Sequence, residues 1–305
     1  MRVGVLVPVH GFAPYLPETL DAILGQRSSA ALEVVVVDDG SSLPIVLHPD
    51  HADRVRLVRR DAAGGPAAAR AAGLAALDDG VAAVALCDAD DTWLPGSVAR
   101  AVDALDAEPA AGWAFGGAVV VGPGGRPTGE AWATLSPGRH AAGTFAARLY
   151  TANPIPTSSV VLRRSALDAA GGFAGPVRVA EDWELWLRLC AAGQDAVCVG
   201  APAVRYRRHP GGLTADVARL AAAQLIVHEL HADVVGLQVA AGIVADDHAA
   251  LAAGLARAGD HAGASAAWAQ VAAARPLQRG ERLRRAALRV PLVRGRLGRT
   301  DPYRG

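Results

Sequence analysis

The chain has 305 residues, 51% of them hydrophobic, so it can bury one substantial core and a smaller appendage. Its 30 basic and 30 acidic residues balance, which excludes the strong positive field of a protein whose main partner is nucleic acid. Ten arginines fall in residues 275–305 against Glu281 and Asp301, so the body of the chain is acidic and its tail is basic.

Cysteine spacing and hydropathy indicate neither export nor a membrane span. Cys87, Cys190 and Cys198 form no CxxC pair, which suits a reducing cytoplasm. The N-terminus begins in a strand pattern without the basic-then-apolar order of a signal peptide. No apolar run reaches ~18 to 20 residues, because polar residues between Gln224 and Asp233 interrupt the best candidate. We therefore expect a cytoplasmic protein, soluble or peripheral at the inner face of the membrane.

The first 120 residues alternate short β-branched runs with stretches rich in alanine and leucine, a pattern typical of βα units on a largely parallel sheet. Strands are predicted at 3–9, 34–37 and 81–87, and helices at 16–26, 66–77 and 97–107. Such sheets bind ligands beyond the carboxyl ends of their strands. Polar groups that follow these strands are therefore the candidates for a site.

The rest of the chain changes from mixed to helical character. Four segments are expected in order: a Gly- and Pro-rich loop over the site at 122–143, a strand from 158, a Trp-rich helix at 181–192 and a strand at 197–208. A helix hairpin is expected at 248–274 around Gly259. The sequence thus predicts an α/β domain over 1–215 and a helical extension with an Arg-rich tail over 216–305.

Acidic residues follow the third predicted strand, in the run Asp88-Ala89-Asp90-Asp91. Carboxylates held at a sheet edge can share Mg²⁺ or Mn²⁺, which prefers oxygen ligands and commonly bridges a diphosphate. The cation would act as a Lewis acid on a departing nucleoside diphosphate. The alternative for this motif alone is a solvated acidic turn.

Two further segments carry weaker signals. Asp39 follows four valines and precedes Gly40, and its carboxylate can accept hydrogen bonds from a nucleobase or ribose. Gly64-Gly65-Pro66 opens a helix whose free amides, with Arg70, face a phosphate or a base carbonyl. Alone, each is also compatible with a plain turn or a Gly-rich helix start.

Seven segments in this order resemble the family-2 glycosyltransferases with the GT-A fold, over about residues 3–213. The segments are VLVPVHG, VVVVDDGS, GGPAAARAAGL, LCDADDTWLPGSV, TSSVVLRRSALDAAGGF, EDWELWLRL and YRRHPGGLT. The resemblance implies a mostly parallel sheet flanked by helices, and transfer of a sugar from a nucleoside diphosphate, with UDP as the first choice. The acceptor would be a hydroxyl of a glycan, a lipid-linked sugar or a small molecule, in polysaccharide, cell-envelope glycan or glycoconjugate synthesis.

The resemblance also assigns roles to residues. It places seven residues at the donor and metal site: Pro8, His10 and Asp39 in the nucleoside pocket, Arg70 nearby, Asp88 near the ribose or sugar, and Asp90 and His209 on Mn²⁺ or Mg²⁺. One departure is Ala71, which stands where the family usually has Asn. This leaves the donor base and sugar open.

The pair Glu181-Asp182 supplies the catalytic candidate. Family-2 enzymes generally invert the anomeric centre, and that chemistry needs one base to take the acceptor proton. We expect Asp182 to be this base and Glu181 to orient the acceptor. Both acids could instead stabilise the start of their helix, where negative charge is favourable.

Two other classes are alternatives. Asp88, Asp90 and Thr92 satisfy the DxDxT pattern of a haloacid-dehalogenase-type phosphatase, but the chain has no lysine and no GDxxxD motif. A degenerate transferase fold acting as a binding module is the non-enzymatic alternative. No nucleic-acid partner is expected. The Arg-rich tail has two interpretations: contact with an anionic membrane, where each basic residue adds about 1 kcal/mol, or a tail that is simply solvated.

Overall fold

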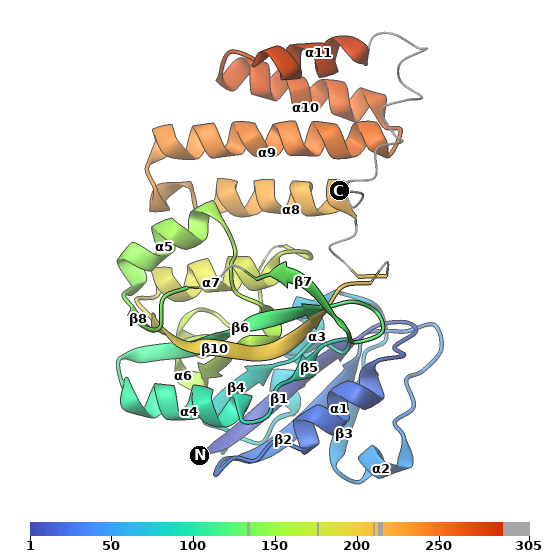
Figure 1. Ribbon diagram of the computed structural model, residues 1–305, viewed down its shortest axis with the longest axis vertical. Helices are drawn as coiled ribbons and strands as arrows, with labels where there is room; N and C mark the ends of the chain where they lie inside the picture. The colour runs from blue at the N-terminus through green and yellow to red at the C-terminus, as the bar shows by residue number, and fades with distance from the viewer. Residues whose placement is uncertain (133–134, 176, 210, 213–215, 289–305) are drawn as a thin grey trace. The chain divides into compact units, whose positions relative to one another are not determined.

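The computed structural model describes residues 1–132, 135–175, 177–209, 211–212 and 216–288. The chain forms two compact units, Met1–Pro210 and Gly211–Gly305. The first unit carries a ten-stranded sheet with its helices, and the second is helical (Figure 1).

The elements of the first unit alternate between strand and helix in its first half (Figure 1). The strands are β1 Arg2–Val9, β2 Ala31–Asp38, β3 Val55–Arg59, β4 Ala83–Leu86, β5 Thr92–Trp93, β6 Ala111–Val121, β7 Pro127–Ala131, β8 Gly138–His140, β9 Val161–Arg163 and β10 Asp195–Arg207. The helices are α1 Leu16–Leu24, α2 Pro49–Ala52, α3 Pro66–Ala76, α4 Ser97–Ala107, α5 Ala142–Thr151, α6 Arg164–Ala169 and α7 Glu181–Ala191, with a 3₁₀ turn η1 at Thr157–Ser159.

The strand order is β3-β2-β1-β4-β9-β6-β10-β5, with β7 paired to β6 and β8 paired to β10. The four strands β3, β2, β1 and β4 run parallel, and Val9 at the end of β1 lies opposite Asp38 at the end of β2. Since parallel strands end at the same edge, the residues that follow β1, β2 and β4 meet there. The mixed α/β architecture confirms the predicted fold class.

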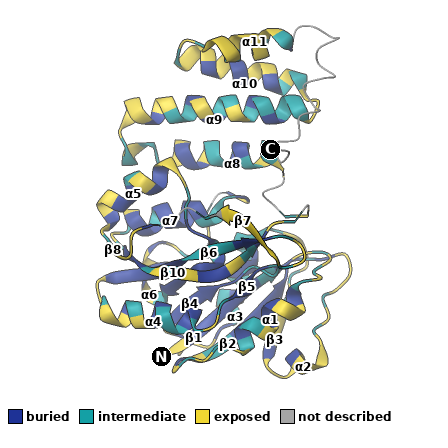
Figure 2. Cartoon of the chain, in the orientation of Figure 1, coloured by how far each residue is buried: buried dark blue, intermediate teal, exposed yellow. Residues whose placement is uncertain are grey.

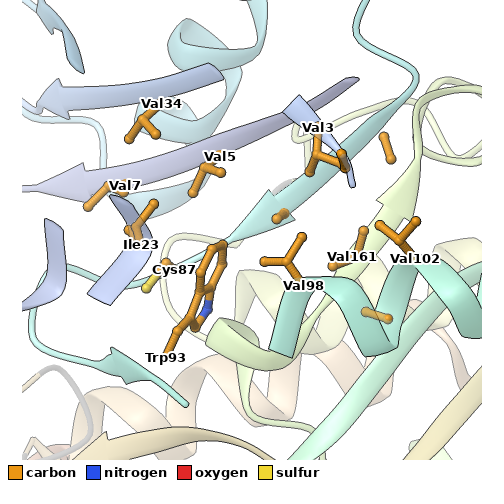
Figure 3. Packing of buried hydrophobic residues seen from close by; sticks show 14 of the residues in the cluster. Val3, Val5, Val7, Ile23, Val34, Cys87, Trp93, Val98, Val102 and Val161 are labelled. Carbon is orange, nitrogen blue, oxygen red and sulfur yellow. The ribbon is translucent and has the colours of Figure 1, made fainter. Parts of the chain in front are cut away.

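Alternation along β1 distributes its side chains between two layers of helices. Val3, Val5 and Val7 pack in one cluster with residues of α1 and α4 (Figure 3). On the other face Leu6 meets α3 at Gly73, where an added Cβ would lie 2.9 Å from a Leu6 methyl carbon. Glycine at this position therefore lets α3 approach the sheet closely. The strands β1 and β4 are largely buried, and α1 and α4 expose the sides turned away from them (Figure 2).

Tryptophans and cysteines of the first unit serve its core. Trp93 and Trp186 are buried, and Trp186 stacks on Trp113 with ring centroids 5.1 Å apart. The cysteines at 87, 190 and 198 are all buried and free. These residues therefore contribute packing area to the core of the first unit.

The predicted loop at 122–143 is wrong in part. The structure forms β7 and β8 within it, and the start of α5. β7 folds back on β6 through a turn at Gly125, whose φ is +74°, and β8 adds to β10. Glycines and prolines suggested a loop, but β7 pairs with the strand that precedes it, and β8 pairs with β10, which lies far along the sequence.

The second unit is a stack of helices. They are α8 Val217–Leu230, a 3₁₀ turn η3 Ala232–Val234, α9 Leu237–Arg257, α10 His261–Ala274 and α11 Arg279–Ala287. The predicted hairpin is confirmed, since Gly259 with φ +86° joins α9 to α10. Trp268 is 1% exposed in a core made mostly of alanines.

Helix α9 corrects one expectation from hydropathy. By length and composition it is long and apolar enough to cross a membrane, with 28% of its most apolar window buried. Hydropathy did not predict this helix. The region considered was the one that the polar residues 224–233 interrupt, and these residues lie in α8 and η3. Helix α9 packs along α8 and α10, and the interior helix of a soluble protein passes the same test. This one helix is therefore weak evidence for a membrane span.

Candidate functional site

The ends of β1 and β2 are joined by polar contacts. The His10 Nδ1 atom lies 2.8 Å from the Asp39 carbonyl oxygen, and the Gly11 N–H donates to Ser41 Oγ at 2.8 Å. Pro8 stands one register position before the end of β1, opposite Val37. The three residues predicted for the nucleoside pocket, at positions 8, 10 and 39, therefore share this edge of the sheet.

The Asp39 carboxylate is already engaged within the protein. It accepts hydrogen bonds from the Gly64 N–H at 3.0 Å and the Gly65 N–H at 2.7 Å, and it forms an ion pair with Arg60. Its neighbour Asp38 accepts from the Ser41 N–H at 2.9 Å and pairs with Arg59. Asp38 thus holds the loop that follows β2, and Asp39 holds the glycine turn that precedes α3.

The acidic run after β4 contains one structural residue and two accessible ones. Asp91 is buried, accepting from Ser158 Oγ at 2.6 Å and from the Arg207 N–H at 2.9 Å. The side chains of Asp88 and Asp90 keep 33% and 35% of their area exposed. Asp91 therefore anchors the run, and the other two acids remain accessible at the edge.

The end of β10 brings a histidine to this run. His209 Nε2 lies 2.9 Å from Asp90 Oδ2. Behind it the buried Arg207 donates to the Asp90 carbonyl oxygen at 2.9 Å and to Glu18 Oε2 at 2.7 Å, with its guanidinium 4.3 Å from the centre of the Tyr15 ring. The structure thus brings together the two residues predicted to hold a metal, Asp90 and His209.

A buried arginine connects the acidic run to α7. Arg70, on α3, is 2% exposed; it donates from Nη2 to Asp88 Oδ1 at 2.6 Å and from Nη1 to Glu181 Oε1 at 2.7 Å. The expected contact of this residue with phosphate or base stays a prediction. What the structure places against its guanidinium is a pair of carboxylates.

Helix α7 begins with Glu181 and Asp182 after a strained residue. Ala180 has φ +58°, and it alone among the described non-glycine residues has a positive φ. Such strain is retained where surrounding structure enforces it, and functional sites are common places for it. The Asp182 Oδ2 atom accepts from Thr157 Oγ1 at 2.6 Å and from Asn153 Nδ2 at 3.2 Å. Asp182 is thus held in one orientation at the start of α7.

Burial and like charge raise the pKa values of Glu181 and Asp90. The pKa of Glu181 is raised to about 7, because burial outweighs the lowering effect of Arg70 and Asp182 adds repulsion. The pKa of Asp90 is also raised, first by burial and then by Asp88, while His209 lowers it. The acids Asp88, Asp90, Glu181 and Asp182 therefore hold more negative charge than Arg70 and His209 balance.

This imbalance suits a divalent cation. Among the described residues no three His, Cys, Asp or Glu side chains lie close enough to hold a metal unaided. Mg²⁺, however, is commonly bound by one or two carboxylates together with substrate phosphates. Asp90, with His209 2.9 Å away, fits that mode, because a cation would relieve the repulsion from Asp88 that adds to burial in raising the pKa of Asp90.

Several residues of this arrangement were not found from sequence. Asn153, Thr157 and Ser158 each orient a site acid, and Glu18 holds Arg207 in place. They are common polar residues in no recognisable pattern, and their bonding partners lie 25 to 189 positions away. Only the Thr-Ser-Ser segment carried a signal, since it was part of the recognised strand motif.

Comparison with known proteins gives a family match and a curated relative. Residues 4–169 match the family described as glycosyl transferase family 2. An uncharacterized glycosyltransferase from Nostoc sp. is 33% identical over 108 residues, which are 34% of this chain and 32% of that protein. The match thus spans about a third of the length of that curated relative.

Solved structures share the fold over nearly the whole chain. The crystal structure of S. aureus TarS 1–349 has a TM-score of 0.62 at 17% identity, covering 98% of this chain and 88% of the other. The mannosyltransferase PcManGT from Pyrobaculum calidifontis, solved with GDP-Man and Mn²⁺, has a TM-score of 0.55 at 20% identity, covering 97% and 86%. At these identities the likeness shows the fold, which is the GT-A fold.

The family match and the fold define a GT-A glycosyltransferase. The family match covers more than half of the chain, so the protein belongs to glycosyl transferase family 2. This confirms the family predicted from the seven segments. The phosphatase alternative has no support from these findings.

Proposed function

We propose that the protein is a metal-dependent, inverting glycosyltransferase that moves a sugar from a nucleoside diphosphate to an acceptor hydroxyl. The observation that carries the proposal is the link through Arg70 from Asp88, which interacts with Asp90, to Glu181, which precedes Asp182. A metal-dependent inverting transferase needs acids at the donor to hold the cation beside the leaving diphosphate, and one base at the acceptor to take the proton of its hydroxyl.

The donor side is formed by Asp88, Asp90 and His209, and by Pro8, His10 and Asp39 around the nucleoside. Mg²⁺ or Mn²⁺ held by Asp90 and His209 would supply Lewis-acid stabilisation of the leaving diphosphate. UDP is the proposed carrier. In support, S. aureus TarS 1–349 has been solved in complex with UDP-GlcNAc and with UDP, and PcManGT with GDP-Man.

The acceptor side is formed by Asp182 and Glu181. Asp182 takes the proton of the acceptor hydroxyl as that oxygen attacks the anomeric carbon, and the bond from this carbon to the diphosphate breaks. Thr157 and Asn153 keep the Asp182 carboxylate oriented for this step. The sugar is transferred with inversion, and the diphosphate leaves with the electron pair.

We propose that the acceptor is a glycan, a lipid-linked sugar or a small molecule in cell-envelope or glycoconjugate synthesis, and that the protein works in the cytoplasm at the inner face of the membrane. The support is charge: Arg279, Arg282 and Arg284 are exposed on α11, next to a tail that holds further arginines. Basic residues of this kind attract anionic lipid surfaces.

A thermal-shift panel of UDP, GDP and dTDP, each with and without Mn²⁺, tests the donor side. A ligand that binds only the folded protein raises its melting temperature. We expect a rise with one nucleotide that requires Mn²⁺, and its loss in Asp90→Ala. The matched control is Asp106→Ala, an exposed aspartate on α4. A metal-independent rise, or the same rise in Asp90→Ala, contradicts the proposed metal site.

A further inference from the structure

Arg70 is unusual among the site residues because it joins two elements that carry different parts of the proposed chemistry. Its Nη2 atom donates to Asp88 after β4, and its Nη1 atom donates to Glu181 at the start of α7. Both distances, 2.6 and 2.7 Å, are those of strong charge-assisted hydrogen bonds. The side chain is 2% exposed, so water scarcely weakens these bonds.

The surroundings of Arg70 hold more negative than positive charge. Asp88, Glu181 and Asp182 all raise the pKa of Arg70, so three carboxylates act on one guanidinium. Its Nε atom is buried with no hydrogen-bond partner among the described residues. Since both terminal nitrogens bond carboxylates, the geometry favours a link between protein groups over a contact with phosphate.

We infer that Arg70 is a positioning residue that ties Asp88 on the donor side to Glu181 on the acceptor side and so fixes the start of α7, with Asp182, relative to the donor. The inference rests on the proposed function. It goes beyond that function because it assigns Arg70 to the spacing of the two acid sets and makes Glu181 its electrostatic partner.

The planar guanidinium explains why this position needs arginine. Two parallel donors on a rigid fork can hold two carboxylates at a fixed separation. The ammonium of lysine is one point charge and cannot reproduce both directions. Arg70→Lys therefore keeps the charge but loses the geometry, and Arg70→Gln loses both.

Glu181 reports on this link through its protonation. Its pKa is about 7 while Arg70 lowers it and Asp182 raises it. Asp88 lies on the far side of the same guanidinium. Without Arg70 the pKa of Glu181 should rise further, so that the group is protonated at neutral pH. Removal of an arginine that lies on α7 but does not bond Glu181 should leave the pKa of Glu181 unchanged.

The first experiment measures this pKa without using activity. Protein labelled with ¹³C at its glutamate carboxyls has eight such groups, and the Glu181→Gln spectrum identifies the signal of Glu181. We expect its titration midpoint near 7 in the wild type and higher in Arg70→Gln. The control is Arg188→Gln, which removes the arginine that pairs with Glu184 on the same helix. An unchanged midpoint in Arg70→Gln, or an equal change in Arg188→Gln, overturns the inference.

The second experiment follows the pH profile of turnover with the nucleotide sugar that the thermal-shift panel selects. In Arg70→Lys we expect kcat at pH 7 to fall by about 10- to 100-fold, as for small misplacements of reacting groups. We also expect the acidic limb of the kcat profile to move to higher pH, because the pKa of Glu181 rises. The donor KM should change little. A raised donor KM with an unchanged kcat would instead make Arg70 a donor contact and overturn the inference.

The two experiments separate the inference from the proposed function. A higher Glu181 midpoint in Arg70→Gln in a protein that transfers no sugar supports the link and defeats the function. Normal transfer by Arg70→Lys, with an unmoved acidic limb, leaves the function standing and defeats the link. Above the raised Glu181 midpoint, we expect the double variant Arg70→Gln/Glu181→Gln to be more stable than Arg70→Gln, because it leaves no ionised buried carboxylate without its partner.

Discussion

The two units of the chain differ in where they bury polar side chains. The first unit buries Asp38, Asp39, Arg70 and Asp91 at or beside the carboxyl ends of its strands. In residues 211–212 and 216–288, the buried polar side chains are His228 and Asp247, which bond each other between α8 and α9. The rest of that interior is mainly alanine around Trp268.

This difference shows where the chain accepts an energetic cost. Buried charges are costly even when paired, and replacing them with apolar residues is often neutral or stabilising. The first unit nevertheless keeps a whole cluster of them at one edge of its sheet, which suggests that chemistry maintains them. The second unit keeps one pair, whose simplest role is to fix how α8 meets α9.

The largest expected effect on turnover is at Asp182, the proposed base in the first unit; the second unit has no proposed catalytic residue. Asp182→Asn should lower kcat by about 10²- to 10⁴-fold, because general-base catalysis contributes this much. Nucleotide binding in the thermal-shift panel should persist. The control is Asp168→Asn on α6, an exposed aspartate that pairs with Arg164. Near-normal turnover in Asp182→Asn would defeat its assignment as the base.

A matched pair of core variants probes whether the units respond separately. Trp186→Ala in the first unit and Trp268→Ala in the second each remove a fully buried indole, which costs about 3 to 5 kcal/mol. We expect two transitions in urea, each lowered by its own variant. Added nucleotide should stabilise only the first unit's transition. A nucleotide-dependent rise in both transitions would contradict independent units.

The raised pKa of Glu181 makes the stability of the first unit depend on pH. The folded protein keeps a proton on Glu181 up to about pH 7, whereas the unfolded chain releases it near 4.5. The free energy of unfolding should therefore fall as the pH rises through this window, by about 3 kcal/mol at about 1.36 kcal/mol per pH unit.

Urea melts at pH 4.5 and 7.5 measure this effect, with Glu181→Gln as the reference. Other carboxyls titrate in the same range and are common to both proteins, so the difference between wild type and variant isolates Glu181. We expect the wild type to lose stability relative to Glu181→Gln as the pH rises. A constant difference would mean that Glu181 has an ordinary pKa.

The smallest expected effect concerns the basic end of the second unit. Arg282→Gln on α11 should weaken binding to phosphatidylserine vesicles by about 1 kcal/mol. The control is Arg219→Gln, which removes an exposed arginine from α8 of the same unit. Co-sedimentation at low salt measures both. An equal loss of vesicle binding in both variants, or no loss in Arg282→Gln, would contradict the proposed membrane contact.

Much of the fold followed from sequence because its signals are local. Four valines in a row predicted β2, and the alanine-rich run after Gly65 predicted α3; both elements are present. β3 and α5 were missed. β3 is a short edge strand with two arginines among its five residues, and α5 begins at the end of a stretch that glycines had marked as a loop.

The candidate site was predictable in its acids and not in their partners. The positions of Asp88, Asp90 and Asp182 came from motif order, and the structure places them around one cluster. The link from Arg70 to Glu181 joins residues 111 positions apart, so no local pattern could reveal it. Long-range pairing of charges depends on how α3 and α7 pack, and that is a property of the fold.

The most direct test of the central claim is the anomeric configuration of the sugar that the enzyme first releases. The donor chosen by the thermal-shift panel, with an α-linked sugar, is incubated with Mn²⁺ and the protein, and hydrolysis is followed by ¹H NMR. The account predicts that the β anomer appears first, before mutarotation, and that Asp182→Asn releases it far more slowly. The α anomer appearing first, or equal rates in both proteins, would contradict inversion with Asp182 as the base.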